Sequence, residues 1–250
     1  MPEAFDSEAD CFQGPHEFRT THWTVVLAAG ESGSAQVAAA LEALCRSYWF
    51  PVYACARRKG CSPEDAEDLT QEFLADLISR GDLAGVSPDR GKFRSFLLAC
   101  LNHFMAKEWR ARRALKRGGG QTVLPLNIVL AEERLAGAAD ASLQPERLFD
   151  QRWAYAVMEQ ALARLRQEMI ETGKSALFEE LKVFLTEAVE AGGYAPVAER
   201  LQMLPDAVAT AVHRLRKRYR ELVRATLANT VATPLELEEE MRYLLEVLSQ

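Results

Sequence analysis

The sequence predicts an all-α protein of two helical domains joined by a flexible linker, with a helix-turn-helix in the second domain and an amphipathic helix at the C-terminus. Three observations lead to this prediction. Apolar residues recur at helical spacing in most segments, and no strand alternation stands out. Three glycines at 118–120 end one helical pattern, and periodicity stays weak until Pro145. The 250 residues, 48% of them hydrophobic, are enough for two small cores.

The first domain is predicted over residues 18–117, after a disordered lead over 1–17. Its first long helix covers about 34–59, where Pro51 is expected to kink the helix or to remove a hydrogen bond, and Gly60 ends it.

The second helix of this domain has a clear start. Ser62 is a candidate N-cap, Pro63 suits the first helical position, and Asp65 stands where a capping box places its acid. The third helix covers about 93–117 and becomes strongly basic beyond Met105.

The linker is predicted over 118–144, with a short helix near 130–135, and the second domain over 145–230. Two helices are expected in the second domain before the segment 194–224, which reads as a short helix, a tight turn and a longer helix. Residues 231–250 are expected to hold an acidic helix whose apolar stripe consists of Leu237, Met241, Leu244, Leu245 and Leu248.

Charge is sorted along a chain whose net charge is −6. Residues 88–117 hold nine Lys and Arg against two acids, and residues 213–224 hold six against one. Residues 61–82 instead hold seven acids against one base. Basic surfaces within an acidic chain indicate a polyanionic partner such as nucleic acid, and the acidic block indicates a different, basic partner.

Several function classes are disfavoured. The five cysteines form no CxxC pair, so neither a zinc site nor a disulfide framework is predicted, and no cofactor is expected. Cys11 and Cys61 are the thiols expected to be exposed. The chain has no apolar run of membrane-spanning length and no basic signal segment, which favours the cytoplasm. Common nucleotide-binding, metalloprotease and hydrolase motifs are missing, so the chain is not expected to be an enzyme or to have a small-molecule substrate.

Three motifs, in order, resemble a bacterial RNA polymerase sigma factor of the extracytoplasmic-function type. They are DAEDLTQEFLADLI at 65–78, RGKFRSFLLACLNHFMAKEWRARRALKR at 90–117, and the 194–224 segment. The resemblance covers roughly residues 18–228. It implies a core-polymerase-binding helix, a helix that opens and reads the −10 promoter element, and a helix-turn-helix that reads the −35 element. The implied partners are core RNA polymerase, promoter DNA and a controller such as an anti-sigma protein.

The resemblance also implies site residues in the first domain. Core polymerase would bind the acidic side chains and one amide of the second helix: Glu64, Asp65, Asp68, Gln71 and Glu72. The −10 element would meet a loop at 82–92, with Ser87, Asp89 and Arg90 as contacts, and then the basic end of the third helix. The residues proposed there are Arg90, Lys107, Trp109, Arg110, Arg112, Arg113, Lys116 and Arg117. Cations can track phosphates, and Trp109 and Phe104 are alternatives between base stacking and core packing.

In the helix-turn-helix, base-reading side chains are expected early in the second helix, on its outer face. The residues proposed for DNA contact are Ala209, Thr210, His213, Arg214, Lys217 and Arg218. Two positions depart from the family pattern, since Gln202 replaces the turn glycine and Leu204 replaces the capping serine. Each departure is expected to cost about 1 kcal/mol.

Two other readings remain open at this point. The acidic C-terminal helix could fold over the basic DNA-binding face, which would make the chain a sigma-like decoy or adapter regulated by that helix. A plain helix-turn-helix regulator is the third reading, although it leaves the 61–117 block without a role.

Overall fold

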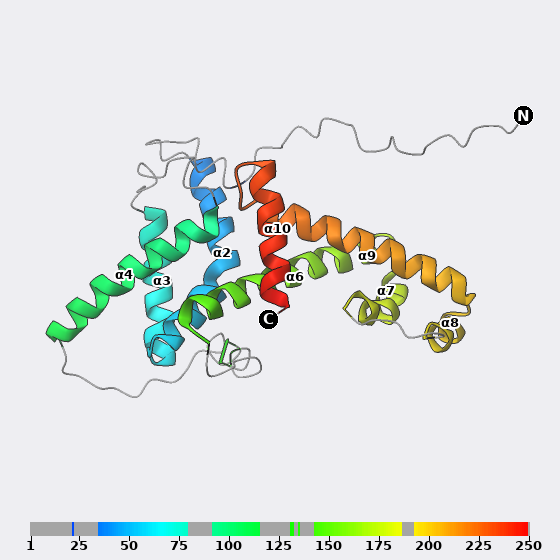
Figure 1. Ribbon diagram of the computed structural model, residues 1–250, viewed down its shortest axis with the longest axis horizontal. Helices are drawn as coiled ribbons and strands as arrows, with labels where there is room; N and C mark the ends of the chain where they lie inside the picture. Colours follow the sequence, from blue (N-terminus) through cyan, green and yellow to red (C-terminus); the bar gives the residue numbers. More distant parts are fainter. Residues whose placement is uncertain are drawn as a thin grey trace, which may run out of the picture.

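The computed structural model describes residues 22, 35–79, 92–115, 131–132, 135, 143–186 and 193–249. Throughout these ranges every regular element is a helix, so the predicted all-α class is confirmed (Figure 1). No described helix combines the length and the apolar character needed to cross a bilayer.

The first helices follow the signals in the sequence. Helix α2 spans Ala35–Arg58 and continues through Pro51, which is buried within it. Helix α3 spans Pro63–Ser79, and the backbone N–H of Asp65 donates to the Ser62 hydroxyl at 3.1 Å, which caps the helix as predicted. Gly60, between the two helices, has a φ of 95°, a conformation in which glycine carries no Cβ strain.

Helix α4 spans Phe93–Leu115. Its first residue, Phe93, is fully buried and meets the Tyr48 ring of α2 edge-on, with ring centroids 5.0 Å apart. Phe73 of α3 packs on Phe104 with centroids 5.5 Å apart. Apolar side chains from α2, α3 and α4 therefore form one end of the core.

We call the described residues of 35–115 the first half and those of 143–249 the second half. The remaining helices lie in the second half. Helix α6 spans Pro145–Glu171, and the short helices α7 (Ser175–Leu181), η3 (Lys182–Leu185) and α8 (Ala195–Leu201) follow. Helix α9 spans Pro205–Ala228 and α10 spans Pro234–Leu248.

Helix α6 joins the two halves of the chain. It packs extensively against α2 on one side and α9 on another, and α10 lies against both α6 and α9 (Figure 1). The buried residues Tyr48, Phe149 and Trp153 meet at this junction, where the Tyr48 and Phe149 rings stack at 6.2 Å. The apolar core consequently continues from α2 into α9 without a break. The predicted domain boundaries remain predictions, but the two halves share this core.

Part of the predicted linker is held against α2. Glu132 accepts hydrogen bonds from Arg57 at 2.7 and 2.8 Å and from the Tyr53 hydroxyl at 2.5 Å. Arg58 donates to the carbonyl of Leu143 at 2.7 Å. These contacts attach two points of the 118–144 segment to the C-terminal end of α2.

The expectation that Cys61 is exposed is wrong, because its side chain is buried where the chain turns from α2 into α3. Burial raises the pKa of both Cys45 and Cys55 to about 12, which keeps these thiols protonated and unreactive. Cys11 lies outside the described residues.

Candidate nucleic-acid and polymerase interface

Helix α3 presents a polar face to solvent. Its apolar residues are turned inward, with Ala66, Leu69 and Phe73 buried against the core. The five residues predicted to bind polymerase lie on the opposite side of the helix. The last four follow Glu64 by one, four, seven and eight residues, a spacing that keeps them on one helical face. Asp68, Gln71 and Glu72 are exposed, whereas Glu64 and Asp65 are half-buried. A basic partner can therefore reach this face, and its role as a polymerase site remains a prediction.

The structure describes only some of the residues predicted to contact the −10 element. Lys107 is exposed on α4, and Phe104 packs on Phe73, which favours the core reading of that ring over base stacking. The backbone of α4 includes Trp109, Arg110, Arg112 and Arg113. The side chains of those four residues lie outside the described part, as do Ser87, Asp89, Arg90, Lys116 and Arg117.

Helices α8 and α9 are joined by a turn of three residues. Gln202 adopts a left-handed conformation with φ 52° and ψ 41°, as expected for a turn position that favours glycine. Leu204 occupies the N-cap position of α9, provides no side-chain cap and is 76% exposed. Pro205 supplies the first helical residue. Gln202 therefore has a left-handed backbone without being glycine, and α9 lacks a side-chain cap, as the two departures from the family pattern led us to expect.

The outer face of α9 is cationic from the third turn of the helix onward. Val208, Val212 and Leu215 are buried, and this orients the opposite side of the helix toward solvent. The residues predicted to contact bases are exposed with the exception of half-buried Ala209: Thr210, His213, Arg214 and Lys217. They span the second to fourth turns of α9.

Two other arginines of α9 have partners within the protein. Arg218 forms a bidentate pair with Glu168 of α6, at 2.7 and 2.8 Å, and also binds Glu221 at 2.9 Å. These carboxylates raise the pKa of Arg218 above its ordinary value. Arg216 donates to the carbonyl of Phe184 at 2.7 Å and so ties α9 to η3. The predicted DNA role of Arg218 must accommodate its exposed ion pairs.

A groove of about 710 Å³ lies beside these residues, between α6, α7 and α9. Its floor is apolar, with Leu165, Leu177 and Leu181 among the lining residues, and Thr210 and Arg214 lie along its α9 side.

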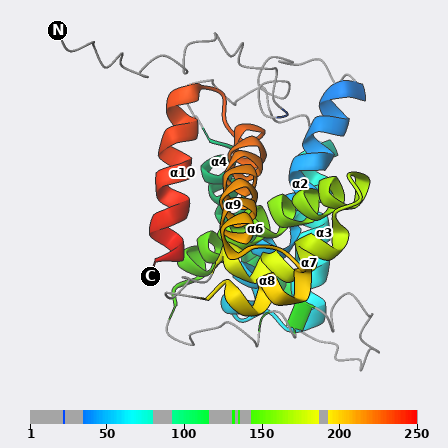
Figure 2. The ribbon, with the colours of Figure 1, turned by 90° about the vertical axis from the view of Figure 1, so that its right-hand side faces the viewer.

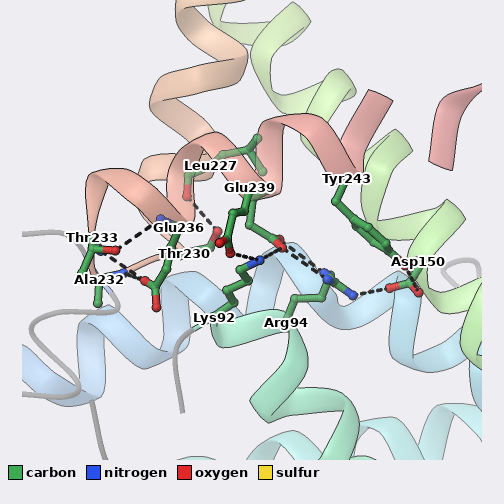
Figure 3. A network of polar contacts seen from close by, with 11 residues as sticks. Lys92, Arg94, Asp150, Leu227, Thr230, Ala232, Thr233, Glu236, Glu239 and Tyr243 are labelled. Atoms are coloured by element: carbon green, nitrogen blue, oxygen red, sulfur yellow. Dashed lines mark hydrogen bonds and ion pairs between the residues drawn. The ribbon is translucent and has the colours of Figure 1, made fainter. Parts of the chain in front are cut away.

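A completely buried carboxylate, that of Glu240 of α10, lies at the junction of the two halves. Arg94, on the first turn of α4, donates to Glu240 of α10 at 3.2 and 3.3 Å and to Asp150 of α6 at 2.6 Å. Lys92 pairs with Glu239 at 2.9 Å and with Glu240 at 3.4 Å. We call these residues, together with Tyr243, the junction network (Figure 3).

Aromatic rings enclose the guanidinium of Arg94. Its central carbon lies 5.0 Å from the ring centroid of Trp153 and 4.3 Å from that of Tyr243. Burial disfavours the charged form, but hydrogen bonding and attraction by Glu240, with Asp150, raise the pKa of Arg94 overall. Burial and the hydrogen bond that Tyr243 donates to Asp150 at 2.7 Å raise the pKa of Tyr243 to about 12.

The sequence analysis missed this network, although a signal was present. The sequence predicts α10 as an acidic helix with Glu240 outside its apolar stripe, but the exposed fraction of Glu240 is 0%. It stands three residues after Leu237 and four before Leu244, in line with the apolar stripe, where a carboxylate requires a buried partner. Conversely, Leu245 was assigned to that stripe and is 64% exposed.

The proposed cover of the DNA-binding face by α10 also needs correction. Glu238 pairs with Arg224 near the end of α9, so α10 neutralises one cation of the basic face. Its other carboxylates reach Lys92 and Arg94 of the other half. His213 and Arg214 remain exposed at the far end of α9, so α10 does not cover the predicted base-reading residues.

Residues 44–115 match the family model described as Sigma-70 region 2. The matched segment runs from the middle of α2, through the acidic helix α3, to the end of α4. Searches of curated proteins and of solved structures returned no match. The match shows that this part of the chain is similar to region 2 of sigma-70 proteins, and it supports the resemblance found in the sequence.

Proposed function

We propose that the chain is an alternative sigma factor of the extracytoplasmic-function type, which binds core RNA polymerase and directs promoter recognition from the cytoplasm. The observation that carries this proposal is the region 2 match over residues 44–115, within which the acidic face of α3 and the basic end of α4 occur in the expected order.

The second half supplies the remaining function. The short helix α8, the three-residue turn and α9 have the arrangement of a helix-turn-helix, and the exposed cations of α9 begin at Arg214, on its third turn. We assign base reading in the −35 element to Thr210 and Arg214, because an arginine can bond guanine through two hydrogen bonds. Arg220 and the other cations of this face hold phosphates.

The first test is run-off transcription with core polymerase on promoters from the same genome. Reversing the charge of Arg214 to glutamate is expected to lower promoter-specific transcript roughly tenfold or more, since a base contact of this kind contributes about 1–3 kcal/mol. Arg46→Glu is the matched control, because Arg46 is an exposed arginine on α2 and is not among the residues predicted to contact DNA. Equal transcript from both variants would contradict the −35 assignment.

The second test addresses polymerase binding. Asp68→Lys and Glu72→Lys are expected to abolish capture of core polymerase in a pull-down, because they replace acids with cations on the exposed face of α3. Glu199→Lys on α8 makes the same change on an exposed residue elsewhere and is expected to leave capture intact. If the wild-type chain neither binds core polymerase nor stimulates transcription, the proposed function is wrong.

A further inference from the structure

We propose that α10 and the junction network hold the two halves of the chain at one fixed separation, so that the protein itself sets the promoter spacing it accepts. The structural part of this inference stands alone, and the promoter part rests on the proposed function. Position 240 is the specificity-determining residue, although it lies far from both predicted DNA contacts.

The first argument is the set of ion pairs around the completely buried Glu240. Glu240 is completely buried, yet its two oxygens bond the Nε and Nη2 atoms of Arg94, while Asp150 binds the remaining Nη1. Pulling α10 away would remove Glu240 from Arg94 and leave the guanidinium paired with Asp150 alone, and losing one partner of a buried ion pair is strongly destabilising. A network of this kind favours a single arrangement of α4, α6 and α10.

The second argument is that α10 is itself held firmly at its start. The Thr233 side chain accepts from the backbone N–H of Glu236, and Glu236 accepts from that of Thr233, so both sides of the capping box are made. Just before it, the carbonyl of Thr230 accepts the backbone N–H of Phe93 at 3.0 Å. The start of α4 is thus bonded directly to the turn between α9 and α10.

The third argument is the apolar interface behind the network. Tyr48, Phe149 and Trp153 are each at most 1% exposed where α2 meets α6. Domains in one chain usually move relative to each other unless the interface between them is large and hydrophobic. This interface is of the hydrophobic kind, so the two halves are expected to behave as one body.

The fixed arrangement places the two predicted DNA-contacting ends far apart. From the Phe93–Thr230 bond, α4 and α9 extend toward opposite ends of the long axis, which is horizontal in Figure 1. Figure 2 looks along that axis, with α9 in front of α4. With a rise of 1.5 Å per residue, Arg112 and Thr210 are each roughly 28 Å from that bond. Their backbones are therefore at most roughly 55 Å apart, the length of on the order of 16 base pairs of B-DNA.

A distance measurement tests the structural part without any assay of function. Labels are placed on exposed residues Ala99 of α4 and Glu199 of α8 through a genetically encoded non-natural amino acid, which leaves the five cysteines unlabelled. We expect one narrow distance distribution for the wild type and a broad one for Glu240→Gln. The control is Glu246→Gln, the same change at an exposed site on α10, which is expected to keep the narrow distribution.

Two results would overturn the structural part: a broad distribution in the wild type, or an unchanged narrow distribution in Glu240→Gln. Far-UV circular dichroism of each variant verifies that it is folded. If Glu240→Gln does not fold, Tyr243→Phe is measured instead. It removes the hydrogen bond to Asp150 while keeping the ring over Arg94, and it is expected to broaden the distribution partly.

Promoter templates with spacers varied one base pair at a time test the functional part. The wild-type holoenzyme is expected to give one optimum, with transcript falling at least tenfold two base pairs to either side. Glu240→Gln is expected to give less transcript at the optimum and a flatter profile. More transcript from Glu240→Gln at every spacing would overturn the inference, because the network would then be inhibitory. No promoter activity in the wild type would overturn the proposed function and the spacing role, while the distance measurement would still decide the structural part.

Discussion

The junction network shows how single residues carry the contact between the two halves. Arg94 is buried under two aromatic rings and still has three carboxylate contacts, from Glu240 and Asp150. The sequence shows a cation, Arg94, next to the apolar Phe93, but it does not indicate which residues pair with Arg94. They lie 56 and 146 residues away along the chain, and one sequence contains no signal that pairs such distant positions.

The network predicts strong coupling between Arg94 and Glu240. Arg94→Met and Glu240→Leu are each expected to lower the free energy of unfolding by about 3 kcal/mol, because each leaves a buried charge without its main partner. The double variant is expected to cost less than the sum of the two, since it leaves neither charge behind. Urea denaturation of the four proteins measures this cycle, and additive effects would show that the pair contributes no specific coupling.

A second residue-level prediction concerns acid. Hydrogen bonding by Arg57, opposed by burial and aided by Tyr53, lowers the pKa of Glu132 below its ordinary value of 4.5. The stabilisation by this pair is therefore complete above pH 4.5 and is lost as the pH falls through the lowered value. Replacing Glu132 with glutamine is expected to weaken the loss of stability on acidification. Urea denaturation across this pH range measures the difference, with exposed Glu199→Gln as control, and parallel curves for wild type and Glu132→Gln would contradict it.

Individual helices were predictable because their ends carry local signals. Pro63, Pro145, Pro205 and Pro234 each begin a helix close to where the sequence placed it. The region after Ser175 was less predictable. Two helices were expected between residues 145 and 194, but α6 and α7 are followed by a third and tighter element, η3. The carbonyl of Phe184 in η3 is bonded by Arg216, a contact from a distant helix that local periodicity does not encode.

The turn before α9 offers a test on a single element. Gln202 holds a left-handed backbone that glycine adopts without a Cβ clash, so Gln202→Gly is expected to raise the free energy of unfolding by about 1 kcal/mol. Gln202→Ala keeps the Cβ and serves as the control, with little expected gain. Thermal denaturation compares the three proteins. A loss of stability in Gln202→Gly would mean that the Gln202 side chain contributes more than the backbone strain costs.

Across the whole molecule, the sequence predicted the parts better than their placement. The order of an acidic helix, a basic helix and a helix-turn-helix could be read from local patterns, and the candidate residues on α3 and α9 lie mostly in solvent. The relative position of the two halves could not be predicted, because a linker's composition fixes only its maximum reach. That position instead depends on Tyr48, Phe149 and Trp153, which look like ordinary core residues of separate helices until α2 and α6 are seen to pack together.

A shared core predicts that the chain unfolds as a unit. If α2, α6 and α9 stabilise one another through Trp153, circular dichroism and tryptophan fluorescence are expected to report the same thermal midpoint, and the calorimetric and van't Hoff enthalpies should agree. Trp153→Ala removes the largest side chain at the junction and is expected to separate the unfolding of the two halves into two transitions. Tyr155→Ala, on the exposed side of α6, is the matched control and should keep a single transition. Two resolved transitions in the wild type would show that the halves are stable independently, and the contact through α6 would then be too weak to fix their separation.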